Sequence, residues 1–155
     1  QVQMNLSDAD LTAAEDLTQE LMQTHSATPY AAFASLELAA EQVRNDQTAA
    51  ALEYLQWTVD QAKLSAQKDL ARLRMARLMV DQAEYAKALE LTQQNVSEGF
   101  VSLFAELKGD IYLAQENKTE AYEAYVESIS SMDADDPRKT LLEMKRDDVA
   151  VINES

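Results

Sequence analysis

The sequence contains no cysteine, so disulfide bonds, thiolate metal sites and cysteine nucleophiles are excluded. Its one histidine, His25, excludes metal sites built from several histidines, and no glycine-rich phosphate loop occurs. Glycine and proline occur only twice each in 155 residues, whereas helix formers such as Ala, Leu, Glu and Gln are plentiful. No run of about 18 apolar residues is present, so no segment is expected to span a membrane. These absences predict an all-α protein that is not an enzyme and uses no cofactor or metal.

Positive charge is scarce and unevenly placed. The chain has 28 acidic and 13 basic residues, a net charge of −15, which excludes the basic surface that nucleic-acid binding needs. No Lys or Arg precedes Arg44, whereas residues 61–80 carry five cations and a single acid, Asp69. Two interpretations stay open for this basic band: a solvated helix whose cations pair with acidic neighbours, or a surface that docks an acidic partner.

Small residues recur in the chain at a regular spacing. Ala39, Ala76 and Gly109 are 37 and 33 residues apart, close to the period of about 34 of tetratricopeptide repeats. The second arms of the same hairpins begin at Ala51, Ala88 and Ala121. Small side chains at these positions allow the two helices of a hairpin to approach closely, and we expect Gly109→Leu to unfold the third hairpin.

The predicted fold is an all-α, right-handed tetratricopeptide-repeat solenoid with about three degenerate repeats and a capping helix at each end. It forms a single domain over residues 1–155. The expected elements are an N-terminal helix within 1–28, helical hairpins at 30–64, 66–96 and 99–132, and a C-terminal capping helix at 137–151. The turns are expected at Asp46, Ala83 and Glu116, where such repeats usually carry glycine.

In such solenoids the first arms line the concave side, which binds peptides or partner helices. The protein-binding residues predicted on this geometry are Phe33, Leu36, Leu70, Leu73, Arg77 and Leu103. We expect Leu73→Asp or Arg77→Glu to weaken partner binding while leaving the helical content unchanged. The alternative is that a cap helix folds into the groove and covers its apolar members. The Lys/Asn clamp for a C-terminal carboxylate is not present, which argues against a co-chaperone of the familiar cytosolic type.

Three further features have open interpretations. Trp57 is expected to be buried under the loop to the next repeat, with an exposed partner contact as the alternative. The acidic turn at 133–136 lacks the spacing of a calcium loop and is expected to cap the helix that Pro137 starts. Glu106 and Asp110, one helical turn apart, could flank a substrate, but we expect them to be solvated.

The stretches EGF from Glu98, AELKGD from Ala105, LAQENKTEAYEAY from Leu113 and LLEMKRDDVA from Leu141 resemble the bacterial ancillary subunit of the Sec translocon. That resemblance implies the periplasmic domain of an inner-membrane, single-pass protein of a Gram-negative bacterium, with its transmembrane anchor upstream of Gln1. The implied partners are Sec translocon subunits, a membrane-anchored periplasmic chaperone of the prolyl-isomerase type, and unfolded secreted clients. The alternative function is a self-associating scaffold of an envelope complex, such as cell-division or outer-membrane assembly machinery.

Overall fold

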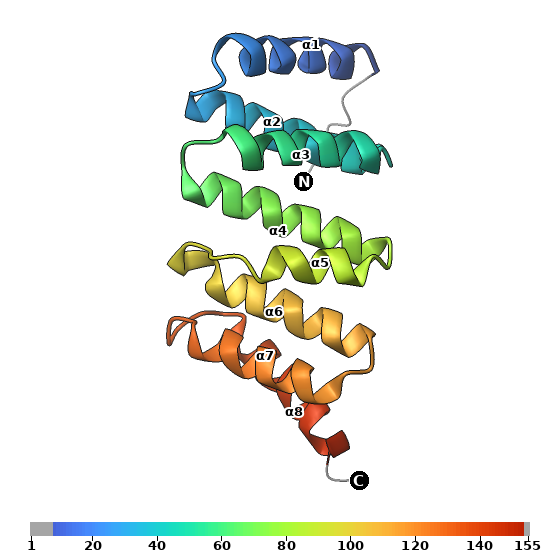
Figure 1. Cartoon of the computed structure of the whole chain (residues 1–155), viewed down its shortest axis with the longest axis vertical. Coiled ribbons are helices and arrows are strands. Elements are labelled where there is room, and N and C mark those ends of the chain that lie inside the picture. The colour runs from blue at the N-terminus through green and yellow to red at the C-terminus, as the bar shows by residue number, and fades with distance from the viewer. Residues whose placement is uncertain (1–7, 154–155) are drawn as a thin grey trace. The chain divides into compact units, whose positions relative to one another are not determined.

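The computed structural model describes residues 8–153, and within this range every regular element is an α-helix (Figure 1). The expectation of an all-α protein is therefore confirmed. The eight helices are α1 (Asp8–Thr24), α2 (Pro29–Arg44), α3 (Thr48–Gln61), α4 (Ser65–Asp81), α5 (Tyr85–Thr92), α6 (Glu98–Ala114), α7 (Lys118–Ser130) and α8 (Lys139–Asn153).

The chain divides into two compact units, which meet in the sequence between Arg72 and Leu73, within α4. We describe each unit by itself. The expectation of a single domain over residues 1–155 stays a prediction, and residues 1–7 and 154–155 lie outside the described range.

Unit 1 is built around the antiparallel pair of α2 and α3, with α1 packed on α2 (Figure 1). Thr28 caps α2, because its side-chain oxygen accepts a hydrogen bond from the Ala31 amide at 3.3 Å, and proline follows it at the first helical position. The small residues Ala39 and Ala51 are fully buried, as the repeat pattern predicts. Ser35, on the same side of α2, donates a hydrogen bond to the carbonyl oxygen of Tyr54 at 2.8 Å.

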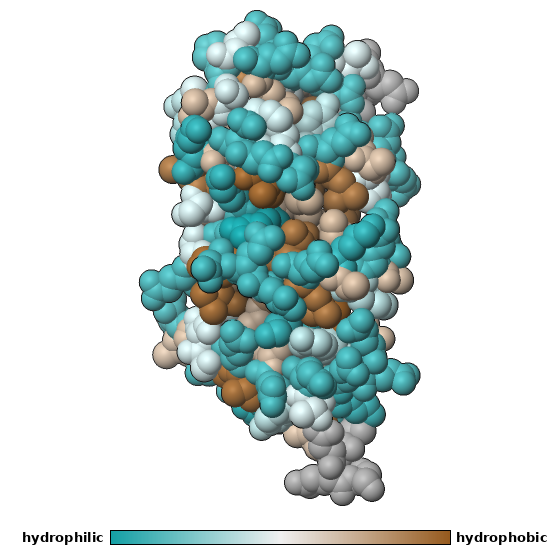
Figure 2. Space-filling view, viewed as in Figure 1, coloured by the Kyte–Doolittle hydropathy of each residue, from teal (hydrophilic) through white to brown (hydrophobic). Residues whose placement is uncertain are grey.

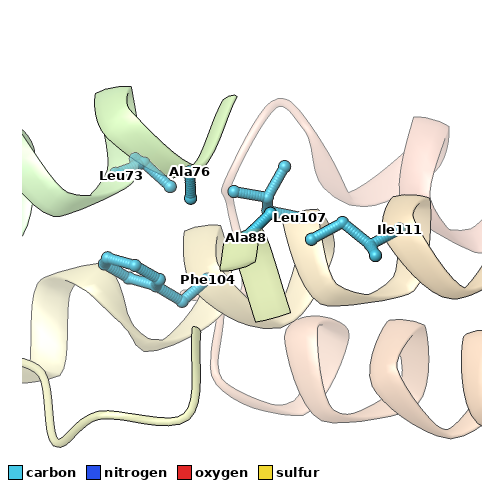
Figure 3. Close-up of a cluster of buried hydrophobic side chains, with 6 residues drawn as sticks. All are labelled: Leu73, Ala76, Ala88, Phe104, Leu107 and Ile111. Carbon is cyan, nitrogen blue, oxygen red and sulfur yellow. The ribbon is translucent and has the colours of Figure 1, made fainter. Parts of the chain in front are cut away.

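Unit 2 contains a buried apolar cluster to which α4, α5 and α6 contribute (Figure 3). Its members are Leu73, Ala76, Ala88, Phe104, Leu107 and Ile111. The cluster includes two of the small residues that define the repeat, one from each arm of the second hairpin. The period read from the sequence therefore corresponds to real helix contacts.

The three turns inside the hairpins share one backbone conformation. Asp46, Ala83 and Glu116 have φ values of 58°, 58° and 63°, and they are the only non-glycine residues with positive φ among those described. In each turn the next amide donates to the carbonyl oxygen five residues before it, as in Glu84 N to Met79 O at 2.8 Å. This is the Schellman ending, which usually has glycine at the left-handed position. The predicted turn positions are confirmed.

The third hairpin and the last helix form the other half of unit 2. Gly109 of α6 faces the ring of Tyr125 of α7, and Tyr125 is fully buried. Helix α8 lies along α7 and buries Leu142 and Val149 against Tyr125 and Ala121. It begins at Lys139, two residues later than expected from Pro137, because residues 137–138 form a turn.

Candidate protein-binding surfaces

The six predicted binding residues differ widely in exposure and belong to two units. Phe33 is 60% exposed and Arg77 is also exposed, whereas Leu36 and Leu73 are only 3% and 2% exposed. The two remaining residues, Leu70 and Leu103, are half-buried. In unit 2, Leu103 packs against the buried cluster that contains Leu73. The expectation that Leu73→Asp leaves the helical content unchanged conflicts with this burial.

An exposed aromatic pair marks the first turn and a half of α2 in unit 1. Tyr30 is 77% exposed and Phe33, one helical turn later, is 60% exposed. The first turn of α4 is tied to the same place, because Gln67 Nε2 donates to the carbonyl oxygen of Pro29 at 3.0 Å. Leu64, in the short connection before α4, is also more than half exposed. Sequence reasoning missed Tyr30, although its spacing of three from Phe33 places both on one side of a helix.

Two cations of the basic band lie near Gln67 in the sequence. Lys63 is exposed and Lys68 is half-buried, in the segment that Gln67 anchors to α2. Arg72 instead forms an ion pair with Asp69, which is fully buried. The ion-pair interpretation of the band therefore applies to Arg72, while Lys63 and Lys68 belong to the segment that Gln67 ties to Pro29.

The first arm of the third repeat is covered by the chain itself. Lys145 of α8 donates to Asp110 at 2.9 and 3.1 Å and to Glu106 at 3.2 Å. Arg138 contacts Glu106 as well, at 3.3 Å. The expectation that these two carboxylates are merely solvated is wrong. They form ion pairs with Lys145 of the cap helix and with Arg138 just before it, so this position of α6 is covered by the chain itself.

Tyr125 of α7 also contacts the ion pair of Lys145 with Asp110. Its hydroxyl donates to Asp110 at 2.7 Å, and Lys145 Nζ lies 5.8 Å from the centre of its ring. Burial, followed by the hydrogen bond to Asp110, raises the pKa of Tyr125 far above its usual value. Partial burial alone would lower the pKa of Lys145, but its hydrogen bonds and charge interactions with Asp110 and Glu106 outweigh this effect and raise it.

The acidic turn before α8 is organised by Arg138. The Arg138 amide donates to Asp136 Oδ1 at 2.8 Å, and the Arg138 guanidinium donates to both oxygens of the same carboxylate. The hydrogen bond from the guanidinium is the main cause that lowers the pKa of Asp136. Across residues 8–153, no three His, Asp or Glu side chains converge as metal ligands. Asp136 thus fixes the turn through Arg138, just before the first residue of α8, and the expectation that the acidic turn caps this helix stays a prediction.

A polar hollow of about 400 Å³ lies in unit 2 where α5 ends early. α5 has 8 residues, whereas the other second arms, α3 and α7, have 14 and 13. The amide side chains of Gln93, Gln94 and Asn95 line the hollow beside α6 and α7. These amides offer hydrogen bonds, and the ion pair of Lys108 with Glu127, at 3.7 Å, lines the same hollow. Trp57, in unit 1, is half-buried, so neither interpretation of this residue is decided.

Comparison with known proteins gives two matches. A family model described as a tetratricopeptide repeat-like domain matches residues 1–151. The "Ancillary SecYEG translocon subunit" of Neisseria gonorrhoeae is 32% identical over 128 residues, which are 83% of this chain and 61% of that protein. The chain therefore spans less than two thirds of the length of this relative. The matches confirm the predicted tetratricopeptide fold class and the resemblance read from the sequence. Within residues 8–153, none of the helices has the length and apolar character needed to cross a bilayer.

Proposed function

Since this chain belongs to the tetratricopeptide repeat-like domain family, we propose that it is a non-catalytic module for protein–protein interaction. The observation that carries this proposal is the exposed pair of Tyr30 and Phe33 on α2. Aromatic side chains bury large areas at low entropic cost and are enriched among residues that dominate binding energies. Figure 2 shows that the displayed face is mostly hydrophilic, with hydrophobic residues emerging only in local patches. An aromatic pair this exposed is unusual for a surface that meets only water.

The proposed partners rest on the name of the relative and on the resemblance read from the sequence. We propose that the chain is part of an ancillary Sec translocon subunit, with this domain in the periplasm of a Gram-negative bacterium and a transmembrane anchor elsewhere in the full protein. In that role it links the channel to a membrane-anchored chaperone of the prolyl-isomerase type and helps to pass on secreted proteins. The name and the 32% identity of the relative support the translocon, and the resemblance supports the chaperone.

The binding surface proposed for this role is the aromatic pair together with Lys63 and Lys68. Apolar contact with Tyr30 and Phe33 would supply most of the affinity, and the lysines would favour partners with acidic residues beside the contact. Arg77, exposed in unit 2, remains a further proposed contact from the sequence. Leu36 and Leu73 would act indirectly, since they support the helices rather than touch a partner.

Affinity capture tests the proposal. The full-length protein, tagged in the bacterium that encodes it, is captured from detergent-solubilised membranes, and the bound proteins are quantified by mass spectrometry. We expect Sec channel subunits and a prolyl-isomerase chaperone to be enriched. Tyr30→Glu combined with Phe33→Glu should lower the recovery of at least one of them about tenfold, which corresponds to a loss of about 1.4 kcal/mol.

Leu17→Glu is the matched control, because Leu17 is as exposed as Phe33 but lies on α1. This variant should recover the same partners as the wild type. Absence of both partners from the wild-type sample would refute the translocon role. Equal recovery with the double variant would refute the aromatic pair as the binding surface.

A further inference from the structure

Helix α8 buries only one of its faces. Leu142 and Val149 are at most 1% exposed, packed on α7, whereas Leu141 and Met144 are 54% and 61% exposed. The exposed residues are three apart and form a ridge along the side of α8 that faces away from the buried residues. Among the described residues of unit 2, no element packs on this ridge.

Helix α6 shows what normally covers such a ridge in this fold. It buries two faces: Leu107 points into the cluster shared with α4 and α5, and Gly109 meets its own second arm at Tyr125 of α7. A step of two residues turns an α-helix by about 200°. The same step leads on α8 from buried Leu142 to exposed Met144. Met144 therefore holds the position at which a first arm receives its second arm, and no second arm follows α8 among the described residues.

The charges along the ridge indicate what kind of helix it accepts. The neighbours of Met144 one turn further along the helix are Asp147 and Asp148, both exposed. Asp147 is paired with Arg146 at 2.7 Å, while Lys145 is turned away onto α6. The ridge is thus apolar in its first half and acidic in its second half. The net charge of −15 opposes a second copy of this chain as the occupant, because two acidic surfaces would face each other.

We infer that the ridge formed by Leu141, Met144, Asp147 and Asp148 docks a cationic amphipathic helix of a partner protein. The partner helix lays its apolar side on Leu141 and Met144 and places Lys or Arg beside the two aspartates. It takes the place on α8 that α7 occupies on α6. This inference rests on the proposed function, since it gives the same binding module a second docking surface.

Two peptides that share the same apolar face serve as probes for binding to the ridge. Both have the sequence of residues 48–62, a second arm of this chain. The cationic peptide carries Glu53→Lys, Gln56→Lys and Asp60→Lys, and the acidic peptide carries Gln56→Glu only. The protein, whole and labelled with ¹³C at its six methionine methyl groups, is titrated with each peptide by NMR. The variant Met144→Leu assigns the signal of Met144.

We expect the Met144 signal to shift with the cationic peptide, and this shift to weaken at 0.5 M salt. Met75 is buried in the core and serves as the internal control, whose signal should stay in place. The acidic peptide should bind at least tenfold more weakly. An unmoved Met144 signal, or equal shifts with both peptides, overturns the inference.

Variants separate this surface from the aromatic pair. Leu141→Glu combined with Met144→Glu should abolish binding of the cationic peptide, and Leu113→Glu, at an exposed leucine of α6, should preserve it. Tyr30→Glu with Phe33→Glu should also preserve it, so failure of the translocon role and failure of the ridge give different results. Sedimentation equilibrium tests whether a second copy of the chain binds to the ridge instead. If the wild type is a dimer and Met144→Glu is a monomer, a second copy is the occupant and the inference of a partner helix is refuted.

Discussion

Gly109 offers a sharp test of the helix packing in unit 2. A Cβ atom at this position would lie 2.5 Å from Cε1, 2.6 Å from Cδ1 and 3.0 Å from Cζ of Tyr125. The tyrosine ring is fully buried and its hydroxyl is held by Asp110 at 2.7 Å, so the ring has no free space into which to retreat. Even Gly109→Ala must therefore push α6 and α7 apart or break the hydrogen bond.

Three contributions determine how much Gly109→Ala changes the free energy of unfolding. Overpacking a filled core costs about 1–3 kcal/mol. Distortion of a hydrogen bond to a charged partner costs a further ~1 kcal/mol or more. Replacing glycine by alanine inside a helix stabilises the helix by about 1 kcal/mol. We expect Gly109→Ala to lower the free energy of unfolding by about 1–3 kcal/mol, although the same exchange stabilises most helices.

The second glycine of the chain is the matched control. A Cβ atom at Gly99 would meet no heavy atom within 4 Å, in the first turn of the same helix. Gly99→Ala should therefore raise the stability by about 0.5 kcal/mol. Urea unfolding followed by circular dichroism at 222 nm measures both variants, and Gly109→Ala combined with Tyr125→Leu should cost less than the sum of the single changes. If Gly109→Ala is as stable as the wild type, the close helix contact inferred here is wrong.

Three further predictions concern single residues. Ala83→Gly should raise the free energy of unfolding by about 0.5–1 kcal/mol in urea, because Ala83 has a φ of 58° and glycine adopts this conformation without strain; a loss of stability would contradict this. Tyr125→Phe should cost about 1–2 kcal/mol at neutral pH through loss of the hydrogen bond to Asp110. Because the pKa of Tyr125 is raised, the folded chain keeps a proton that the unfolded chain releases near pH 10. The free energy of unfolding of the wild type should therefore fall above about pH 10, and it should fall less steeply in Tyr125→Phe. Urea midpoints compared at pH 8 to 11 measure this difference. Leu73→Asp should unfold unit 2 because it places a charge in the core, whereas Arg77→Glu, at an exposed site, should keep the wild-type circular dichroism spectrum.

The repeat architecture was predictable because it depends on local size and spacing. Small residues at Ala39, Ala76 and Gly109 mark the helix contacts, and polar or short residues mark the turns seven positions later. The turns contain no glycine, yet their positions were correct, because the repeat period carried the information that the residue type did not. The early end of α5 and the late start of α8 were not predictable, because helix ends shift by one or two residues and Pro137, which suits the first turn of a helix, here lies in the turn before α8.

Binding residues were harder to predict than helices. Phe33 and Leu36 lie on one apolar stripe of α2, but Phe33 is exposed and Leu36 is buried. Periodicity identifies such a stripe without showing which part of it neighbouring helices cover. The ion pairs of α8 present the same difficulty, because Lys145 is 35 residues from Asp110 and 39 from Glu106, and opposite charges at such separations occur throughout the sequence.

The cap helix also determines which surfaces remain open to partners. Its partly exposed ion pairs with α6 hold α8 weakly, at about 0–1 kcal/mol each. Burial of Leu142 and Val149 contributes more, about 1.5–3 kcal/mol for each side chain. A ligand for Glu106 and Asp110 must displace α8 and so loses about 3–6 kcal/mol, which weakens its binding by roughly 10²- to 10⁴-fold. Tyr30 and Phe33, and the outer ridge of α8, need no such displacement. Under the proposals made above, partners should therefore engage these two surfaces rather than the carboxylates that α8 covers.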